Sequence, residues 1–117
     1  MLEPQLIALL HGVVGEGNVY ADVALSGAKA PWVTFQQIGG KSPIHLDQQL
    51  VNKRNGLFQI SVYALDRPRA TQIALQIEAA LSLSEMQIAP VGAMRSSYEL
   101  ETKLYGAMQD FSIWADR

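Results

Sequence analysis

The chain has 117 residues, a net charge of −2 and no cysteine. This length corresponds to one domain, and we predict that residues 1–117 form it. Proteins that bind nucleic acid usually carry a surplus of Lys and Arg, because phosphate contacts supply most of the affinity. The acidic balance therefore argues against a sequence-specific nucleic-acid binder, and the lack of cysteine excludes disulfides and thiolate metal sites.

The hydropathy pattern gives no membrane segment. No apolar run reaches the ~18 residues that a membrane-spanning helix needs. The N-terminal segment is apolar, but it carries Glu3 and no basic residue, which is not typical of a secretory signal. We therefore expect no membrane partner and a protein that is made and kept in the cytoplasm.

Two helices are predicted. The first runs from Pro4 to His11, with Pro4 in its first turn and Gly12 as its end. The second begins after Asp66, a typical N-cap, and runs from Arg67 to about Leu83. Its apolar residues recur at helical spacing and predict one buried stripe: Ala70, Ile73, Ala74, Ile77, Ala80 and Leu81.

Strands account for most of the remaining pattern. The clearest runs from Leu57 to Ala64, where Phe58, Ile60, Val62 and Ala64 alternate with more polar residues. Others are predicted at residues 19–25, 32–38, 93–100 and 105–115, with a short one at 86–89 that Pro90 ends. The order predicts an α+β fold with a single antiparallel-rich or mixed sheet of four to five strands and two helices on one face.

Residues 39–56 have no clear period. The segment opens with Gly39 and Gly40, and Asn55-Gly56 at its end is a strong turn signal. We predict a hairpin or loop at about 39–55 that is mobile in the isolated chain, with Lys53 and Arg54 at its tip. Surface charge alone explains these two basic residues, and pairing with a neighbouring subunit is the alternative.

Motifs for nucleotide binding are incomplete. Gly39-Gly40-Lys41-Ser42 is similar to the end of a P-loop, but Phe35 stands where the first glycine belongs and Pro43 follows. Gly15-Glu16-Gly17 begins a dinucleotide fingerprint without its third glycine. A turn explains both segments, so we expect no cofactor.

Catalytic and metal-binding patterns are equally weak. His11 falls at a predicted helix end and His45 in the long loop, and neither belongs to a close cluster of metal ligands. Glu99 and Glu101 lie at the end of a predicted hairpin, where solvated acidic side chains are common. We therefore predict that the protein is not an enzyme and binds no metal.

The order of the elements is similar to that of a known family. The N-terminal helix leads to Val19–Val23, and Ala30–Phe35 follows. The strand Leu57–Ala64 runs into the helix at Arg67, and Gln109–Trp114 closes the chain. Together these segments resemble the small tail completion, or tail terminator, proteins of long-tailed bacteriophages and prophages. The resemblance covers nearly the whole chain, except the variable region at 39–55.

The resemblance implies a structural subunit without catalytic residues. It implies a ring, typically a hexamer, that terminates the tail tube and joins it to the head, with the tail tube protein and the head-tail connector protein as partners. Assembly would occur in the host cytoplasm and the product would be part of the virion tail. A ring needs two different patches on each subunit, and we predict one of them in the long hairpin: Ile44, Leu46, Leu50, Val51, Lys53 and Arg54. The alternative is a small monomeric binding or regulatory domain.

Overall fold

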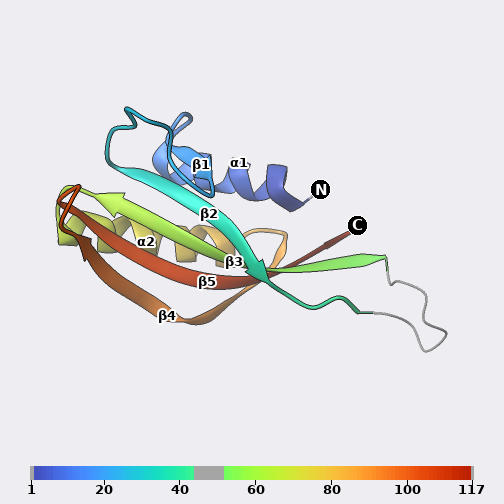
Figure 1. Cartoon of the computed structure of the whole chain (residues 1–117). Coiled ribbons are helices and arrows are strands. Elements are labelled where there is room, and N and C mark those ends of the chain that lie inside the picture. The colour runs from blue at the N-terminus through green and yellow to red at the C-terminus, as the bar shows by residue number, and fades with distance from the viewer. Residues whose placement is uncertain (1, 44–51, 117) are drawn as a thin grey trace.

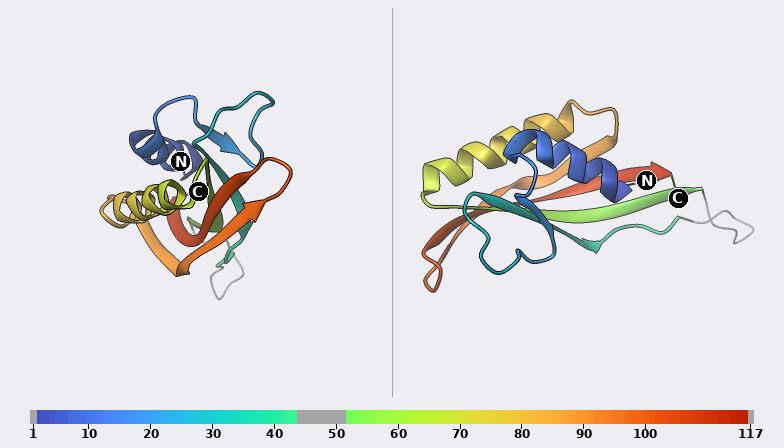
Figure 2. Two further views of the ribbon diagram at one scale, coloured as in Figure 1. Left: turned by 90° about the vertical axis from the view of Figure 1, so that its left-hand side faces the viewer. Right: turned by 90° about the horizontal axis from the view of Figure 1, so that it is seen from above.

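The computed structural model describes residues 2–43 and 52–116. Two helices, α1 (Leu2–Val14) and α2 (Arg67–Ser82), lie side by side on one face of a sheet (Figures 1 and 2). The sheet has five strands: β1 (Val19–Ala21), β2 (Trp32–Gly39), β3 (Lys53–Ala64), β4 (Gln87–Glu99) and β5 (Leu104–Asp116). The predicted α+β class, with both helices on one face, is confirmed.

The sheet is mixed. Its strand order is β1-β2-β3-β5-β4. The short β1 runs parallel to β2, and every other neighbouring pair is antiparallel. The strands are strongly twisted, so the hairpin of β4 and β5 curves away beneath the helices (Figure 2). In this strand order, β1 and β4 are the two edge strands of the sheet.

Helix α2 follows the predicted register. The side chain of Asp66 accepts a 2.8 Å hydrogen bond from the backbone N–H of Arg69, which caps the first turn. Ile77, in the middle of the stripe, is 2% exposed and lies against the sheet. The stripe is buried at Ala70, Ile73, Ala74, Ile77 and Leu81, whereas Ala80 is only half-buried.

The core lies between this helical layer and the sheet. Strand β3 supplies the predicted alternation, with Phe58, Ile60, Val62 and Ala64 all buried toward the helices. Helix α1 adds three buried leucines at helical spacing, Leu2, Leu6 and Leu10. Burial of these side chains is the main stabilising contribution to the two-layer arrangement.

The first helix is longer than predicted. It begins at Leu2 and continues through Gly12 to Val14. A glycine inside a helix costs only about 1 kcal/mol relative to alanine, and Val13 and Val14 beyond it pack against the core. The left-handed residue that ends the helix is Gly15, with φ 88°, whose N–H donates to the carbonyl of His11 at 2.8 Å.

The strands predicted at residues 19–25, 86–89 and 93–100 also differ from the structure in extent. β1 stops at Ala21 instead of Leu25, because Asp22 adopts a left-handed conformation with φ 64° that turns the chain away from the sheet. Residues 86–89 and 93–100 do not form separate strands. They belong to one strand, β4, which contains Pro90. Proline is tolerated there because β4 is an edge strand: among residues 2–43 and 52–116, no strand pairs with its outer side.

Candidate interaction surface

At one end of the molecule, the start of β3, the end of β5 and the chain that follows β2 extend past the helices. They lie along the 52 Å long axis (Figure 1). Residues 44–51 connect β2 to β3 at this end. We call segment 39–55 the arm and its described residues, 39–43 and 52–55, the arm base.

Asn55 holds the arm base together. Its side-chain amide is 7% exposed and bonds in three directions. The Nδ2 group donates to Ser112 Oγ at 3.0 Å and to the carbonyl of Ile113 at 3.2 Å, both on β5. Its Oδ1 accepts from the backbone N–H of Lys41 at 2.9 Å. One buried side chain therefore ties the chain leaving β2 to both β3 and β5.

The Asn55-Gly56 pair is consequently not a turn. Both residues lie inside β3, where Asn55 pairs with Trp114 and Gly56 with Ile113 of β5. A Cβ on Gly56 would overlap the ring of Phe58, so the glycine leaves room for a buried aromatic side chain. The pairing with β5 and the close packing of Phe58 therefore outweigh the local preference of Asn-Gly for a turn.

Lys53 and Arg54 were predicted at a hairpin tip, and this prediction is wrong. Both residues lie at the start of β3. The Nζ of Lys53 is 2.6 Å from Oδ1 of Asp116 on β5. The Arg54 guanidinium donates to Oε1 of Gln37 on β2 at 2.5 Å. Both contacts are exposed and bridge neighbouring strands, so these two cations strengthen the pairing at the arm base by modest amounts.

The segment that is similar to a P-loop forms the other side of the arm base. Gly39 ends β2, and residues 40–43 continue without a helix. Gly40 has φ 137°, and a Cβ there would lie 2.6 Å from the carbonyl oxygen of Asn55. The glycine permits this close backbone approach. Residues 40–43, the described part of the chain after β2, contain no helix N-terminus that could receive a phosphate.

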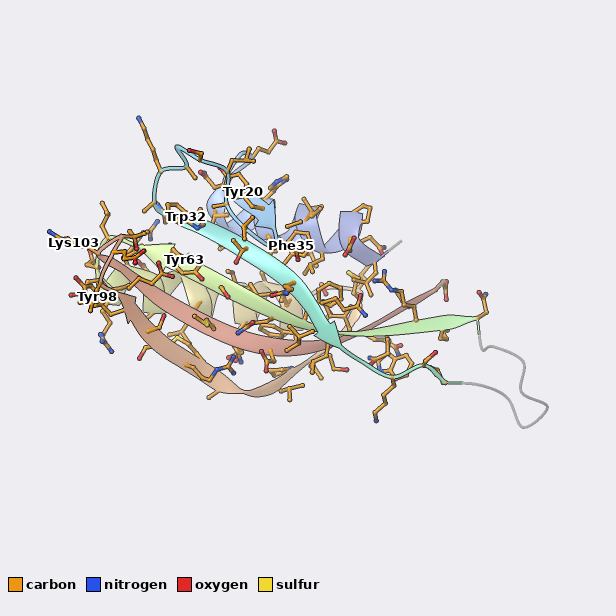
Figure 3. All side chains as sticks on the ribbon, in the orientation of Figure 1. Tyr20, Trp32, Phe35, Tyr63, Tyr98 and Lys103 are labelled. Atoms are coloured by element: carbon orange, nitrogen blue, oxygen red, sulfur yellow. The ribbon has the colours of Figure 1, made fainter. Side chains whose placement is uncertain are left out.

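The face of the sheet away from the helices has an aromatic cluster at the opposite end. The rings of Trp32 and Tyr63 are 5.8 Å apart, on neighbouring strands (Figure 3). Tyr63 also covers Gly106 on β5, where its Cε1 lies 3.6 Å from the position that a Cβ would take. An aromatic side chain over a cross-strand glycine supplies the apolar contact that glycine itself lacks.

Among the described residues, the side chains of Tyr63 and Asp116 have shifted pKa values. Burial, and then the charge of Glu99, raise the pKa of the Tyr63 phenol above its ordinary value. The hydrogen bond from Lys53 lowers the pKa of the Asp116 carboxyl. Neither shift indicates catalysis, because the two groups lie at opposite ends of the sheet and each has a structural partner.

The predicted interface residues are only partly described. Ile44, Leu46, Leu50 and Val51 lie outside the described residues, as does His45, so their predicted roles stay predictions. His11 is in the last turn of α1, as expected, and Gly15 and Gly17 belong to a turn. Within residues 2–43 and 52–116, no group of three or more His, Asp or Glu side chains could hold a metal ion.

Sequence reasoning missed Asn55 as the residue that organises this end. The available signal was the position of Asn55 just before Leu57, where the predicted strand could begin earlier and include it.

No helix in the described parts of the chain has the length and apolarity to span a membrane.

The fold defines a class: small α+β proteins with two helices on one face of a mixed five-stranded sheet. The chain belongs to the tail completion protein gp17 family, whose model matches residues 4–116. It is therefore a structural protein of a bacteriophage tail and a component of the virion.

Comparison with solved structures supports the same fold. A chain in "Virion of native gene transfer agent (GTA) particle" superposes with a TM-score of 0.58 and 18% sequence identity. The match covers 97% of this chain and 91% of that chain. A search of curated protein sequences finds no match.

Proposed function

We propose that the protein forms a ring that terminates the tail tube and joins it to the head. The observation that carries the proposal is the family match, which extends over residues 4–116 and thus includes both layers of the fold. The likeness to a chain of a gene transfer agent particle supports the same kind of role. Binding partners under this proposal are further copies of the chain, in a hexamer, the tail tube protein and the head-tail connector protein.

The arm supplies one patch of the contact between copies in this proposal. A ring uses heterologous contacts, in which two different patches of neighbouring subunits meet. Residues 44–51 include four apolar side chains, Ile44, Leu46, Leu50 and Val51. In the sequence they lie between residues 39–43 and 52–55, which Asn55 links through its hydrogen bonds to Lys41 and Ser112. We assign them, with Lys53 and Arg54 at the arm base, to the surface that contacts the neighbour.

The proposal places assembly in the host cytoplasm, before the tail joins the head. A test replaces residues 44–51 with a short Gly-Ser linker and measures mass in solution, by light scattering, over a range of protein concentrations. The same variant is then supplied to a phage or prophage that lacks the wild-type gene. We expect the variant to fold, to stay monomeric and to yield tails without heads.

A matched control alters the turn at the other end of the molecule. Replacing Glu101 and Lys103 with serine changes exposed residues between β4 and β5 that the proposal does not use. This control should assemble like the wild type. If the linker variant completed tails as well as the control does, the arm would not be the contact.

The alternative function is a small monomeric binding or regulatory domain. It predicts one molecular mass at every concentration and no association with purified tail tubes. A wild-type protein that neither forms a ring when concentrated nor binds the tube end would favour this alternative over the ring.

A further inference from the structure

The pair Asn55-Gly56, at the start of β3, combines a structural role with chemical reactivity. Asparagine followed by glycine is the pair that most readily forms a succinimide, because glycine has no side chain to hinder the approach of its backbone nitrogen to the asparagine amide. We infer that Asn55 is a site of spontaneous deamidation and that its side-chain hydrogen bonds protect it in the folded protein. The site does not depend on the proposed ring.

The reaction needs no enzyme and no cofactor, only water and a base from solvent. The backbone nitrogen of Gly56 loses its proton to the base and attacks Cγ of Asn55, so that a new C–N bond closes a five-membered ring. The bond from Cγ to Nδ2 breaks, and Nδ2 takes up a proton from solvent and leaves as ammonia. One water molecule then opens the ring at either carbonyl, which gives aspartate or isoaspartate.

Three hydrogen bonds hold the amide away from this reaction. Nδ2, the leaving group, donates to Ser112 Oγ at 3.0 Å and to the carbonyl oxygen of Ile113 at 3.2 Å. Oδ1 accepts from the backbone N–H of Lys41 at 2.9 Å. Attack by the nitrogen of Gly56 requires the side chain to rotate, and this rotation would break the bonds.

The backbone of the pair is also unsuited to ring closure. Asn55 pairs with Trp114, and Gly56 pairs with Ile113. A strand keeps ψ at about +135°, which points the nitrogen of the next residue away from the side chain. Asn55 is 7% exposed, so solvent base reaches the pair poorly. Ring closure therefore requires the start of β3 to open locally first.

Packing explains why the fold uses a reactive pair. A Cβ on Gly56 would overlap the ring of Phe58, which is fully buried. Asn55 supplies both donors and an acceptor to its three partners. An ionised aspartate only accepts hydrogen bonds, so it cannot replace the amide. Each residue is thus required by its own contacts, although the two together are reactive.

Either product of deamidation should loosen the arm base. Aspartate at position 55 loses the two donors, and its charged oxygens would face the carbonyl oxygen of Ile113. Isoaspartate also adds one carbon to the main chain, which shifts the register of β3 on β5. Asn55→Asp reproduces the first product and should unfold at a lower urea concentration than the wild type. An equal midpoint would overturn the predicted loosening.

Peptide mass spectrometry tests the site in the full chain. The wild type is incubated in one mildly alkaline buffer, either folded or unfolded in urea, and the conversion of each asparagine to acid is followed over time. In urea, Asn55 should react faster than Asn18 and Asn52, because Val19 and Lys53 follow those two. In the folded protein, Asn55 should react at least about tenfold more slowly, since local opening must come first. Equal rates in the folded and unfolded protein would overturn the protection, and a rate in urea no higher than that of Asn18 would overturn the site.

Ser112→Ala measures the contribution of one hydrogen bond. It removes the acceptor at 3.0 Å, and the folded variant should deamidate at Asn55 about 2–10-fold faster than the wild type. Ser97→Ala is the matched control, because Ser97 Oγ lies against Gly106 and not at the arm base, and it should react at the wild-type rate. Circular dichroism checks that both variants are folded. Equal rates in the two variants would overturn the protective role of this bond, and the wild-type comparison decides by itself should Ser112→Ala fail to fold.

Discussion

The side-chain amide of Asn55 donates a 3.0 Å hydrogen bond to the hydroxyl of Ser112, 57 residues away in the sequence. This contact joins the start of β3 to the end of β5, the two strands that pair at this end of the molecule (Figure 1). Since Asn55 also bonds the backbone of Lys41, it holds the chain that follows β2 against the start of β3.

Asn55→Ala should lower the free energy of unfolding by about 1–3 kcal/mol, because it leaves the partners of a buried amide without hydrogen bonds. Urea denaturation measures the change. Gln36→Ala, an exposed change on β2, is the matched control and should alter stability by no more than about 0.5 kcal/mol. Equal effects of the two substitutions would show that Asn55 does not stabilise the arm base.

Ile77→Ala should lower the free energy of unfolding by about 2–5 kcal/mol, because it removes a large side chain from the core between α2 and β3. Leu75 lies two residues away on the same helix and is 55% exposed, so Leu75→Ala should cost much less. Thermal or urea denaturation of both variants tests the register of α2. A smaller loss for Ile77→Ala than for Leu75→Ala would contradict that register.

Gly106→Ala should destabilise the protein by about 1–3 kcal/mol, since the added methyl group would overlap Ser97 Oγ on β4. That hydroxyl is buried and has no hydrogen-bond partner among the described residues. Ser97→Ala should therefore be close to neutral. The double variant should recover most of the loss, because the methyl group then occupies the space of the hydroxyl. A double-mutant cycle measures this coupling, and strict additivity would refute the contact.

Stability should fall at alkaline pH through Tyr63. Burial raises the pKa of its phenol above the ordinary value of 10.0 in the folded state. A group with a raised pKa stabilises the fold below its unfolded pKa, and this contribution disappears as the pH rises through the folded pKa. Tyr63→Phe should remove that part of the pH dependence above pH 10.0 and keep the contact with Trp32. Denaturation at several alkaline pH values checks it, and an unchanged profile in the variant would contradict the assignment.

Asp66→Ala should destabilise the protein by about 0.5–2 kcal/mol through loss of the N-cap of α2. Asp66→Asn keeps a side-chain oxygen for the Arg69 N–H and should retain most of the stability. Urea denaturation distinguishes the two variants. A similar loss in both would mean that the charge of the carboxylate, and not its hydrogen bond, stabilises the helix.

Local patterns in the sequence were sufficient for much of this protein. The N-cap Asp66 and the spacing of Ile73 and Ile77 predict α2 with its buried face. The alternation in Leu57–Ala64 predicts which side of β3 enters the core. These features depend on hydrogen bonds and side-chain spacing within a few residues, so they can be recognised without knowledge of the rest of the chain. The order of the elements also led to the tail completion family, which the family match confirms.

Other features were decided only by the tertiary structure. The pair Asn55-Gly56 favours a turn locally, yet partners on β5 and in residue 41 hold it in a strand. Pro90 suggests the end of a strand, yet β4 continues past it because β4 is an edge strand of the sheet. Gly12 suggests the end of a helix, yet the packing of Val13 and Val14 extends α1 to Val14. In each case, contacts between residues distant in sequence, or a position at the sheet margin, outweigh a preference worth about 1 kcal/mol or less.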